Sequence, residues 1–277
     1  MSVSARLIVH ADDFGIAPAV NDGIVEAHER GIVTSTSIMA TGPAFDRAAE
    51  LARSRPSLDV GVHLVLTEQA PLCGGSVPSL VGTDGRFLPH ATALARRSLA
   101  GGVVLDEVRR ELDAQIRRVR AAGLAVTHLD GHQHVQALPG VARVVADLAA
   151  EHGIGAVRYP AERLRGYMLR QPRSRRLAEL AALRLAAAAS PLRRLRGCDE
   201  FVGFYFGGRL GEANLATLVA GLPAGRTTEL MCHPGKPGMA ADGWDYAWAE
   251  ELAALTSPRI RELLSARGVQ LISYRDL

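Results

Sequence analysis

The stretch that decides the fold is residues 7–40, which read LIVHADDFGIAPAVNDGIVEAHERGIVTSTSIMA. The apolar run 7–11 predicts a strand, and the segment 18–30 predicts a helix with Pro18 in its first turn. The run 34–40 predicts a second strand. A strand, a helix and a strand in this order are typical of a βαβ unit, in which the two strands are parallel.

The same alternation continues along the chain and favours an α/β fold. Further strands are predicted at 58–66, 125–130, 154–159, 201–206, 227–232 and 268–274, and helices at 45–54, 105–122, 140–152, 212–221 and 257–267. Seven or eight parallel strands with helices outside them fit a TIM-like (β/α)7–8 barrel, either closed or distorted. An open doubly wound sheet is the alternative fold.

Length and composition favour one globular domain that spans 1–277. The chain has 277 residues, of which 48% are hydrophobic and 22% charged, and this composition excludes a disordered chain, a fibrous repeat and a disulfide scaffold. Two segments interrupt the alternation. We expect a long active-site loop at about 67–102, which is rich in Gly and Pro, and an Arg/Leu-rich insertion at about 161–200.

Three features of the sequence bear on the compartment. No window reaches the roughly 18 uncharged apolar residues of a membrane span, and the chain start lacks the charged and apolar regions of a secretory signal. The cysteines Cys73, Cys198 and Cys232 are odd in number and belong to no CxxC pair, so neither a disulfide framework nor a thiolate zinc cage is indicated. We therefore expect a cytoplasmic protein.

The basic charge of the chain is concentrated in one segment. Between Arg163 and Arg196 ten arginines face one acid, Glu179, a local sum of +9. The segment is either a solvated helical hairpin or, because leucines are mixed with the arginines, a surface that contacts an anionic membrane. The second alternative would place the protein peripherally at the inner membrane surface. One aromatic residue, Tyr167, is too few for base stacking, so we expect no nucleic-acid partner.

Two acids and a histidine follow predicted strands at opposite ends of the chain. Asp12 and Asp13 come directly after the strand 7–11, where adjacent carboxylates repel each other unless a cation lies nearby. The alternative is that one acid caps the next helix and the other is solvated. His233 ends the strand 227–232 and precedes a Pro- and Gly-rich turn, which predicts an exposed ring. A surface histidine without a function is the alternative there.

A denser group of polar side chains occurs at 127–135, THLDGHQHV. His128, Asp130, His132 and His134 occupy every second position, so they point to the same side for as long as the strand lasts. Imidazole and carboxylate donors in this number suit zinc, which usually takes about three protein ligands in catalytic sites, and the remaining residues would orient a ligand or contact substrate.

His63 gains significance from this group. A single imidazole inside the apolar strand 58–66 is more often a hydrogen-bonded core histidine than a metal ligand. However, Asp12 and Asp13, His63, the 127–135 group and His233 each lie near the carboxyl end of a separate predicted strand. Because these ends converge on one face of a barrel, we expect a single pocket there.

The motifs, taken together, resemble those of the YdjC-like carbohydrate deacetylases over most of the chain. They are HADDFG, NDGIVEAHERGIVTSTSIM, GVHLVLTE, THLDGHQHVQALP and ELMCHPG, in that order from residue 10 to residue 235. The stretch FVGFYFGG and the closing RGVQLISYRDL are more similar to the hopanoid-biosynthesis-associated HpnK branch than to the branch that acts on chitin disaccharides.

The resemblance implies a TIM-like barrel that binds one divalent metal ion and removes the acetyl group from an N-acetylated amino sugar. Asp13, His63 and His128 would hold the ion, Asp12 would be the general base and His233 the general acid. The donor types favour Zn²⁺ and tolerate Mg²⁺.

Four further residues would lie around this set. Asp130 would orient either a ligand imidazole or the ring of His233. His132 and His134 would contact the sugar. His10 would likewise position another residue or bind substrate. The HpnK branch implies the N-acetylglucosaminyl headgroup of a hopanoid glycolipid as substrate.

Three other functions stay open from the sequence. A soluble chitooligosaccharide is the alternative substrate for the same chemistry. A phosphoesterase is less favoured, because such sites often use two metal ions and the sequence offers clear ligands for one. A non-catalytic sugar-binding module would leave Asp12 and His233 without a role.

Overall fold

The strands of the molecule form one curled parallel sheet. The computed structural model describes residues 4–188, 190–237 and 244–277. Its strands are β1 (Arg6–Phe14), β2 (Ser35–Ile38), β3 (Asp59–Leu64), β4 (Val126–Gly131), β5 (Ala156–Val157), β6 (Glu200–Val202), β7 (Thr227–Cys232) and β8 (Gln270–Ile272). They include every strand predicted from the sequence, although β5, β6 and β8 are shorter than predicted.

The order of the strands confirms the distorted-barrel prediction. Neighbours run β5-β4-β3-β2-β1-β7-β6, and β8 pairs with the first half of β1. This order is that of a seven-stranded barrel opened between β5 and β6. A single bridge from Ala156 to Arg196 spans the opening. A doubly wound sheet would instead reverse its strand order in the middle, so that alternative is wrong.

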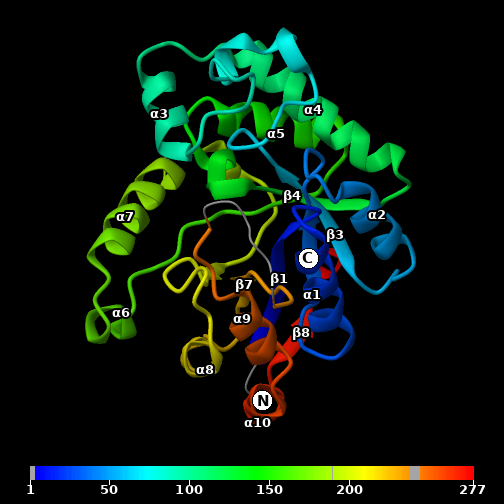
Figure 1. Cartoon of the computed structure of the whole chain (residues 1–277). Helices are drawn as coiled ribbons and strands as arrows, with labels where there is room; N and C mark the ends of the chain where they lie inside the picture. Colours follow the sequence, from blue (N-terminus) through cyan, green and yellow to red (C-terminus); the bar gives the residue numbers. More distant parts are fainter. Residues whose placement is uncertain (1–3, 189, 238–243) are drawn as a thin grey trace.

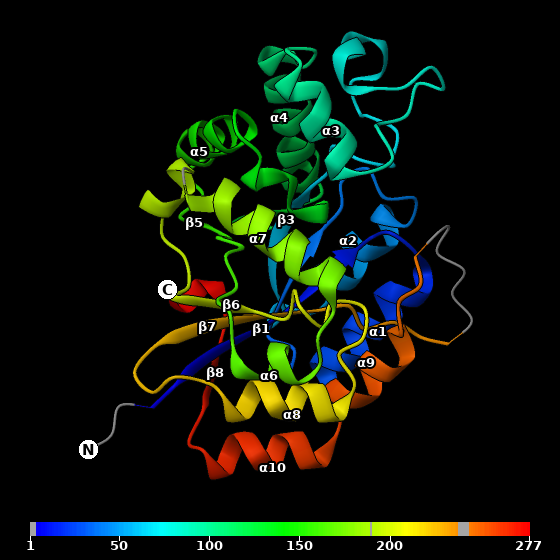
Figure 2. The same cartoon turned by 90° about the vertical axis from the view of Figure 1, so that its left-hand side faces the viewer.

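Helices surround the sheet and most of them lie on its outer face, as Figures 1 and 2 show. They are α1 (Pro18–Glu29), α2 (Phe45–Arg53), α3 (Ala91–Leu99), α4 (Leu105–Ala121), α5 (Val141–Glu151), α6 (Gly166–Arg170), α7 (Ser174–Ala188), α8 (Glu212–Ala220), α9 (Trp248–Leu255) and α10 (Pro258–Ala266). Helix α4 shows why these segments pack: Val108, Leu112, Ile116 and Val119 lie on one face and are fully buried, while most of its arginines are exposed.

Both segments that interrupt the sequence pattern carry helices of their own. The segment 67–102 contains α3, and the segment 161–200 contains α6 and α7, in the opening between β5 and β6. Figures 1 and 2 show α3 and α7 on the same side of the barrel. Within the described ranges, none of the helices combines the length and apolar character that crossing a bilayer requires.

A backbone irregularity at the end of β1 determines how its two acids point. The pairing of β1 with β2 shifts between Ala11 and Phe14, and Asp13 has a left-handed φ of 68°. In a regular strand, adjacent side chains point to opposite faces. Because of the bulge, Asp12 and Asp13 are both buried, at 3% exposure each, and both line the same pocket.

Candidate active site

A pocket of about 910 Å³ lies at the carboxyl ends of the strands. Its floor contains Asp12, Asp13, His63, His132 and His233. Its walls come from the two interrupting segments and from the chain after β7, and they include Ala91, Thr92 and Ala95, Arg173 to Arg176 with Glu179, and Trp244 to Tyr246. The predicted convergence of distant strand ends on one pocket is therefore observed.

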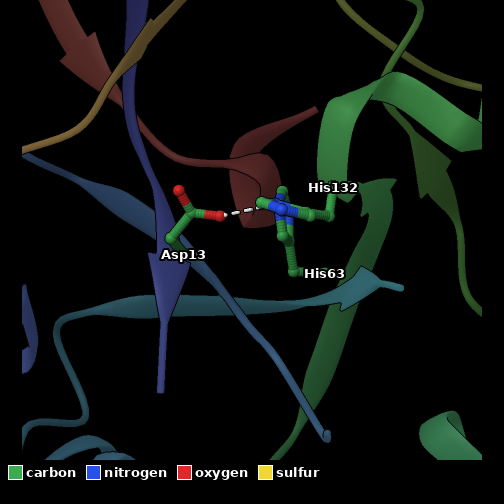
Figure 3. A group of neighbouring side chains, drawn as sticks. All are labelled: Asp13, His63 and His132. Atoms are coloured by element: carbon green, nitrogen blue, oxygen red, sulfur yellow. Dashed lines mark hydrogen bonds and ion pairs between the residues drawn. The ribbon is translucent and has the colours of Figure 1, made fainter. Parts of the chain in front are cut away.

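Asp13, His63 and His132 form a close group in this pocket (Figure 3). Asp13 Oδ1 lies 2.9 Å from His132 Nδ1 and 3.2 Å from His63 Nε2. One ligand atom from each of the three residues lies within 4.8 Å of the other two. Both rings are almost fully buried, so the three donor atoms are shielded from bulk water.

Mutual contacts shift the pKa of all three groups. Burial raises the pKa of Asp13, but His132 and His63 together lower it far below its usual range. Burial lowers the pKa of His63, but the Asp130 charge and hydrogen bonding with Asp13 raise it to about 10. The pKa of His132 is raised to about 9, since Asp13 and Glu68 outweigh its burial. The pocket floor is therefore a strongly cation-attracting environment.

This group fits a divalent metal ion. It offers one carboxylate and two imidazoles, a donor set that zinc and related ions accept, and it faces a pocket that leaves further coordination positions open. The surrounding hydrogen-bonded network holds four buried carboxylates, Asp12, Asp13, Asp130 and Glu229, against a single buried guanidinium and the two imidazoles with raised pKa. A divalent ion at this group would replace the protons that the two imidazoles otherwise carry.

That guanidinium belongs to Arg158, and it fills a second group of ligand-type residues. His10, Asp12 and Asp130 also bring their donor atoms within 4.8 Å of one another. Arg158 is fully buried and donates to Asp12 Oδ1 and Oδ2, both at 2.7 Å, and to Glu229 at 2.8 Å. Its Nη1 lies 3.0 Å from Asp130. The cation of this second group is therefore a side chain.

Asp130 connects the two groups and orients His63. Its Oδ1 lies 2.9 Å from His63 Nδ1, and Ser37 donates to its Oδ2 at 2.9 Å. The pairing of β3 with β4 places His63 directly opposite Asp130, which explains this contact. With Nδ1 held by a carboxylate, His63 presents Nε2 to Asp13 and to the pocket.

His128 does not lie with Asp13 and His63, so the ligand set that the resemblance implied does not match the geometry. Its Nε2 is 2.8 Å from His10 Nε2, and its ring stacks on Tyr274 at 3.9 Å. A side chain at Gly61 would collide with this ring. His128 is two residues before Asp130, which puts it about 6.6 Å deeper in the barrel.

His132 takes the place expected for His128, because the chain changes conformation after β4. The strand ends at Gly131, and Gln133 and His134 have left-handed φ values of 51° and 57°. The predicted alternation therefore stops at Asp130. His134 packs against Phe201 and Phe204, and burial lowers its pKa to about 3.

His233 lies in the pocket, but the prediction of an exposed ring is wrong. Its exposure is 5%, because the aromatic rings of Tyr246 and Trp248 pack against it. Glu251 accepts a hydrogen bond from the His233 backbone N–H at 2.6 Å. Burial lowers the pKa of His233, against the opposing charges of Asp13 and Asp12.

Sequence reasoning missed several residues of the site, some of which carry a recognisable signal. Arg158 and Glu229 are charged residues inside short apolar strands, an arrangement that is costly unless the charges are paired. Their presence could have predicted a buried ion pair between strands. Glu68, Trp244 and Glu251 carry no comparable signal, since loops and helices commonly contain such residues.

The fold and the site define a barrel protein with an Asp-His-His group at the carboxyl ends of its strands, and similar proteins are known. The YdjC-like protein family matches residues 6–266. A carbohydrate deacetylase from Mus musculus is 40% identical and covers 98% of this chain and 94% of its own. A chitooligosaccharide deacetylase from Klebsiella pneumoniae is 36% identical, over 98% of both chains.

Solved structures also resemble the molecule. A protein from Enterococcus faecalis, named for cellobiose-phosphate cleavage, has a TM-score of 0.80 and 29% identity, over 99% of this chain and 98% of that one. The family match covers most of the chain, and several curated relatives exceed 30% identity. The chain therefore belongs to the YdjC-like family.

Proposed function

We propose that the protein is a metal-dependent N-deacetylase that hydrolyses the acetamide of an N-acetylated amino sugar. The observation that carries this proposal is the Asp13, His63 and His132 group, which meets in one pocket beside Asp12 and His233. The carbohydrate deacetylase activity named for the family's relatives supports the same chemistry. A binding module would need neither a second carboxylate beside the ion ligands nor an imidazole on the opposite wall.

In this proposal Asp13, His63 and His132 hold one divalent ion, with zinc favoured by the donor types and magnesium as the alternative. Such an ion supplies Lewis acidity, which polarises an acetyl carbonyl and acidifies water. Asp130 acts through His63, whose Nδ1 it holds at 2.9 Å. His128 and His10 lie deeper in the barrel than the proposed ligands. His10 contacts Arg158 and His128 contacts His10, so both help to hold the Arg158 guanidinium in place.

Asp12 is the proposed general base. Burial raises its pKa, but the Arg158 charge and the contact with His10 lower it well below its usual range, so the carboxylate stays ionised. Each carboxylate oxygen has lone pairs to spare after accepting from Arg158. Asp12 is therefore ionised and able to take a proton from water in the pocket, and it returns readily to the ionised form because Arg158 lowers its pKa.

His233 is the proposed proton donor to the leaving nitrogen. Its lowered pKa leaves the ring neutral at neutral pH. His233 would therefore first take up the proton that Asp12 removes from water and then deliver a proton to the leaving nitrogen. Its Nδ1 is buried and, among the described residues, has no hydrogen-bond partner. The ring is therefore free to take part in such a transfer. His134, which also lines the pocket, is proposed to contact the sugar.

The substrate that we propose is an N-acetylglucosaminyl glycolipid, with hopanoid as the lipid implied by the HpnK-like segments. The pocket of about 910 Å³ offers more room than a single sugar needs. Segments 67–102 and 161–200 both line it and would form part of one functional unit with the barrel. Ala182 and Leu183 of α7 give one wall an apolar character that suits an aglycone.

A lipid-linked substrate would require contact with a membrane, and the α6–α7 region has the chemistry for it. Leu164, Leu169 and Leu185 are between 69% and 80% exposed. Among the described residues, Arg193 and Arg194 are exposed and make no ion pair with a carboxylate. Exposed leucines among arginines suit an anionic bilayer surface, where each arginine contributes about 1 kcal/mol.

A soluble chitooligosaccharide is the second candidate substrate, favoured by the Klebsiella pneumoniae relative. One experiment tests both. The purified protein is incubated with an N-acetylglucosaminyl glycolipid and, separately, with chitobiose, with and without a chelator. We expect a product lighter by about 42 mass units, as hydrogen replaces acetyl, and its loss when the ion is removed. Activity that survives complete removal of the ion would contradict the proposal.

Membrane contact has its own test. Co-sedimentation with vesicles that contain anionic lipid should exceed that with neutral vesicles and should fall at high salt, because salt screens the arginines. Replacement of Leu169 and Leu185 by Ser should weaken the association without changing activity on chitobiose. Equal binding to neutral and anionic vesicles would show that the arginines do not drive the association, and no binding to either would show that the arginine-rich region is only a solvated surface.

A further inference from the structure

Glu68 lies at the edge of the pocket in an unusual backbone conformation. It follows β3 and has a left-handed φ of 66°, a conformation that is strained for a residue other than glycine. Hydrogen bonds hold it there: its N–H donates to Leu88 O at 2.9 Å, and its carbonyl accepts from Arg86 Nε at 3.0 Å. Such conformations are often found at functional sites.

One oxygen of the Glu68 carboxylate receives two hydrogen bonds. Its Oε2 lies 3.0 Å from His132 Nε2 and 3.2 Å from Trp244 Nε1, which donates to it. A carboxylate can only accept, so the contact with Glu68 keeps a hydrogen on His132 Nε2. His132 Nδ1 also faces a carboxylate, at 2.9 Å from Asp13, and its hydrogen is the one that an ion would displace.

Trp244 connects this carboxylate to the far side of the pocket. Its ring centre is 5.3 Å from that of His132 and 4.9 Å from that of Tyr246. The Tyr246 ring is in turn 4.8 Å from that of His233. Three contacts therefore lead from Glu68 to the proposed proton donor, along aromatic rings that line the pocket. Aromatic faces of this kind are suited to packing against the apolar face of a sugar.

We propose that Glu68 is a positioning residue that couples the metal site to the aromatic wall of the pocket. By accepting from His132 and from Trp244 with the same oxygen, it presents Nδ1 of His132 to the ion and fixes the indole beside it. This inference rests on the proposed function, since it assigns His132 as a ligand. It adds that ion binding and the position of Trp244 influence each other, because such coupling is reciprocal.

The chain offers a direct spectroscopic test, because it has only two tryptophans. Trp248 Nε1 is buried and has no partner among the described residues, so Trp248→Phe removes no hydrogen bond and leaves Trp244 as the single reporter. In this background, zinc alone is titrated into the metal-free protein while calorimetry and Trp244 emission are recorded. We expect zinc binding and a change of emission at one ion per chain.

Adding Glu68→Ala should raise the zinc Kd about 10- to 100-fold, the usual effect of losing a carboxylate that orients a ligand histidine. At saturating zinc, the change of Trp244 emission should be much smaller than in the parent. Glu179→Gln is the matched control, because Glu179 also lines the pocket but pairs with Arg175 and Arg176. Glu68→Gln, which keeps one acceptor, replaces Glu68→Ala if that variant does not fold, as judged by circular dichroism.

The outcomes distinguish a failure of the Glu68 inference from a failure of the proposed function on which it rests. An unchanged zinc Kd in Glu68→Ala would overturn the positioning role while the metal site stands. A raised Kd with an undiminished emission change would overturn the coupling to Trp244. A parent protein that binds no zinc, manganese or magnesium would overturn the proposed function itself, and this inference with it.

Discussion

Two groups of histidine and aspartate side chains lie next to each other in the barrel, and they differ in the source of their cation. His10, Asp12 and Asp130 surround the fully buried Arg158. Asp13, His63 and His132 face the pocket, and among the described residues no lysine or arginine pairs with Asp13. Residue types alone do not distinguish a structural ion pair from a metal site. The depth in the barrel and the presence of an internal cation do.

The largest effect is expected at the pocket-facing group. Asp13→Asn should abolish metal retention and lower kcat/KM by about 1,000-fold or more, since the ion supplies several kcal/mol of transition-state stabilisation. Asn is the right replacement because it tolerates the left-handed backbone at this position. Metal analysis of the purified variant and acetate release measure the two effects. Normal metal content in Asp13→Asn would contradict the ligand assignment.

Replacement of Asp12, the acid adjacent to Asp13, should affect turnover but not metal retention. Asp12→Asn should keep the ion but lower kcat by about 100- to 10,000-fold, the usual range for a lost general base. Since Asp12 is paired with the buried Arg158, the variant should also be less stable, which thermal unfolding measures. Equal loss of metal in Asp12→Asn and Asp13→Asn would mean that the division between the two groups is false.

A smaller effect on metal affinity is expected at Asp130, which contacts both groups. Asp130→Asn leaves the ligands in place but weakens the hold on His63 Nδ1. We expect zinc affinity to fall by about 10- to 100-fold, with activity restored at high zinc concentration. Isothermal titration of the metal-free variant gives the Kd, and activity that saturating zinc fails to rescue would indicate that Asp130 acts in the chemistry directly.

The smallest effect on metal binding is expected at Glu251, a buried carboxyl that pairs with no lysine or arginine among the described residues and that affects stability instead. Burial raises the pKa of Glu251 to about 8, although backbone N–H groups of His233 and Leu210 oppose the shift. The folded state then keeps a proton that the unfolded chain releases above its ordinary pKa of about 4.5. The contribution of Glu251 to stability is therefore full below that value and decreases as the pH rises towards 8.

Glu251→Gln removes this titration. Between pH 4.5 and 8, the difference in unfolding free energy between the wild type and the variant should decrease with rising pH, by an amount on the order of a few kcal/mol. Denaturant unfolding at several pH values measures it. A difference that stays constant across the range would show that Glu251 is ionised in the folded protein, as Asp12 and Asp13 are.

The sequence predicted the barrel because its strands and helices alternate with strong local signals. Asp13 and His63 were recognised because each follows or ends an apolar run. His128 and His132 could not be told apart, since spacing by two residues determines the face of a strand but not the level in the barrel. The turn at Gln133 and His134, with its left-handed backbone, depends on tertiary packing and leaves no clear mark in the sequence.

Helices α3 and α9 were missed, and α6 and α7 were expected only as a helical hairpin somewhere within 163–196. Their segments contain Gly, Pro or dense arginine, which weaken local periodicity. Strand β5 has two residues, too few for a local sequence signal to predict its bounds. Arg158 follows it directly, and the Arg158 N–H donates to Leu129 O, which continues the pairing with β4. Pairing with β4, rather than local propensity, determines its position.

The most direct test compares the two histidines of the 127–135 segment. His128→Gln and His132→Gln are purified without metal and titrated with zinc under identical conditions. We predict that His132→Gln loses high-affinity binding, whereas His128→Gln binds one zinc per chain with an affinity within about 10-fold of the wild type. Loss of zinc binding in His128→Gln, together with full binding in His132→Gln, would contradict the assignment of the metal site to Asp13, His63 and His132.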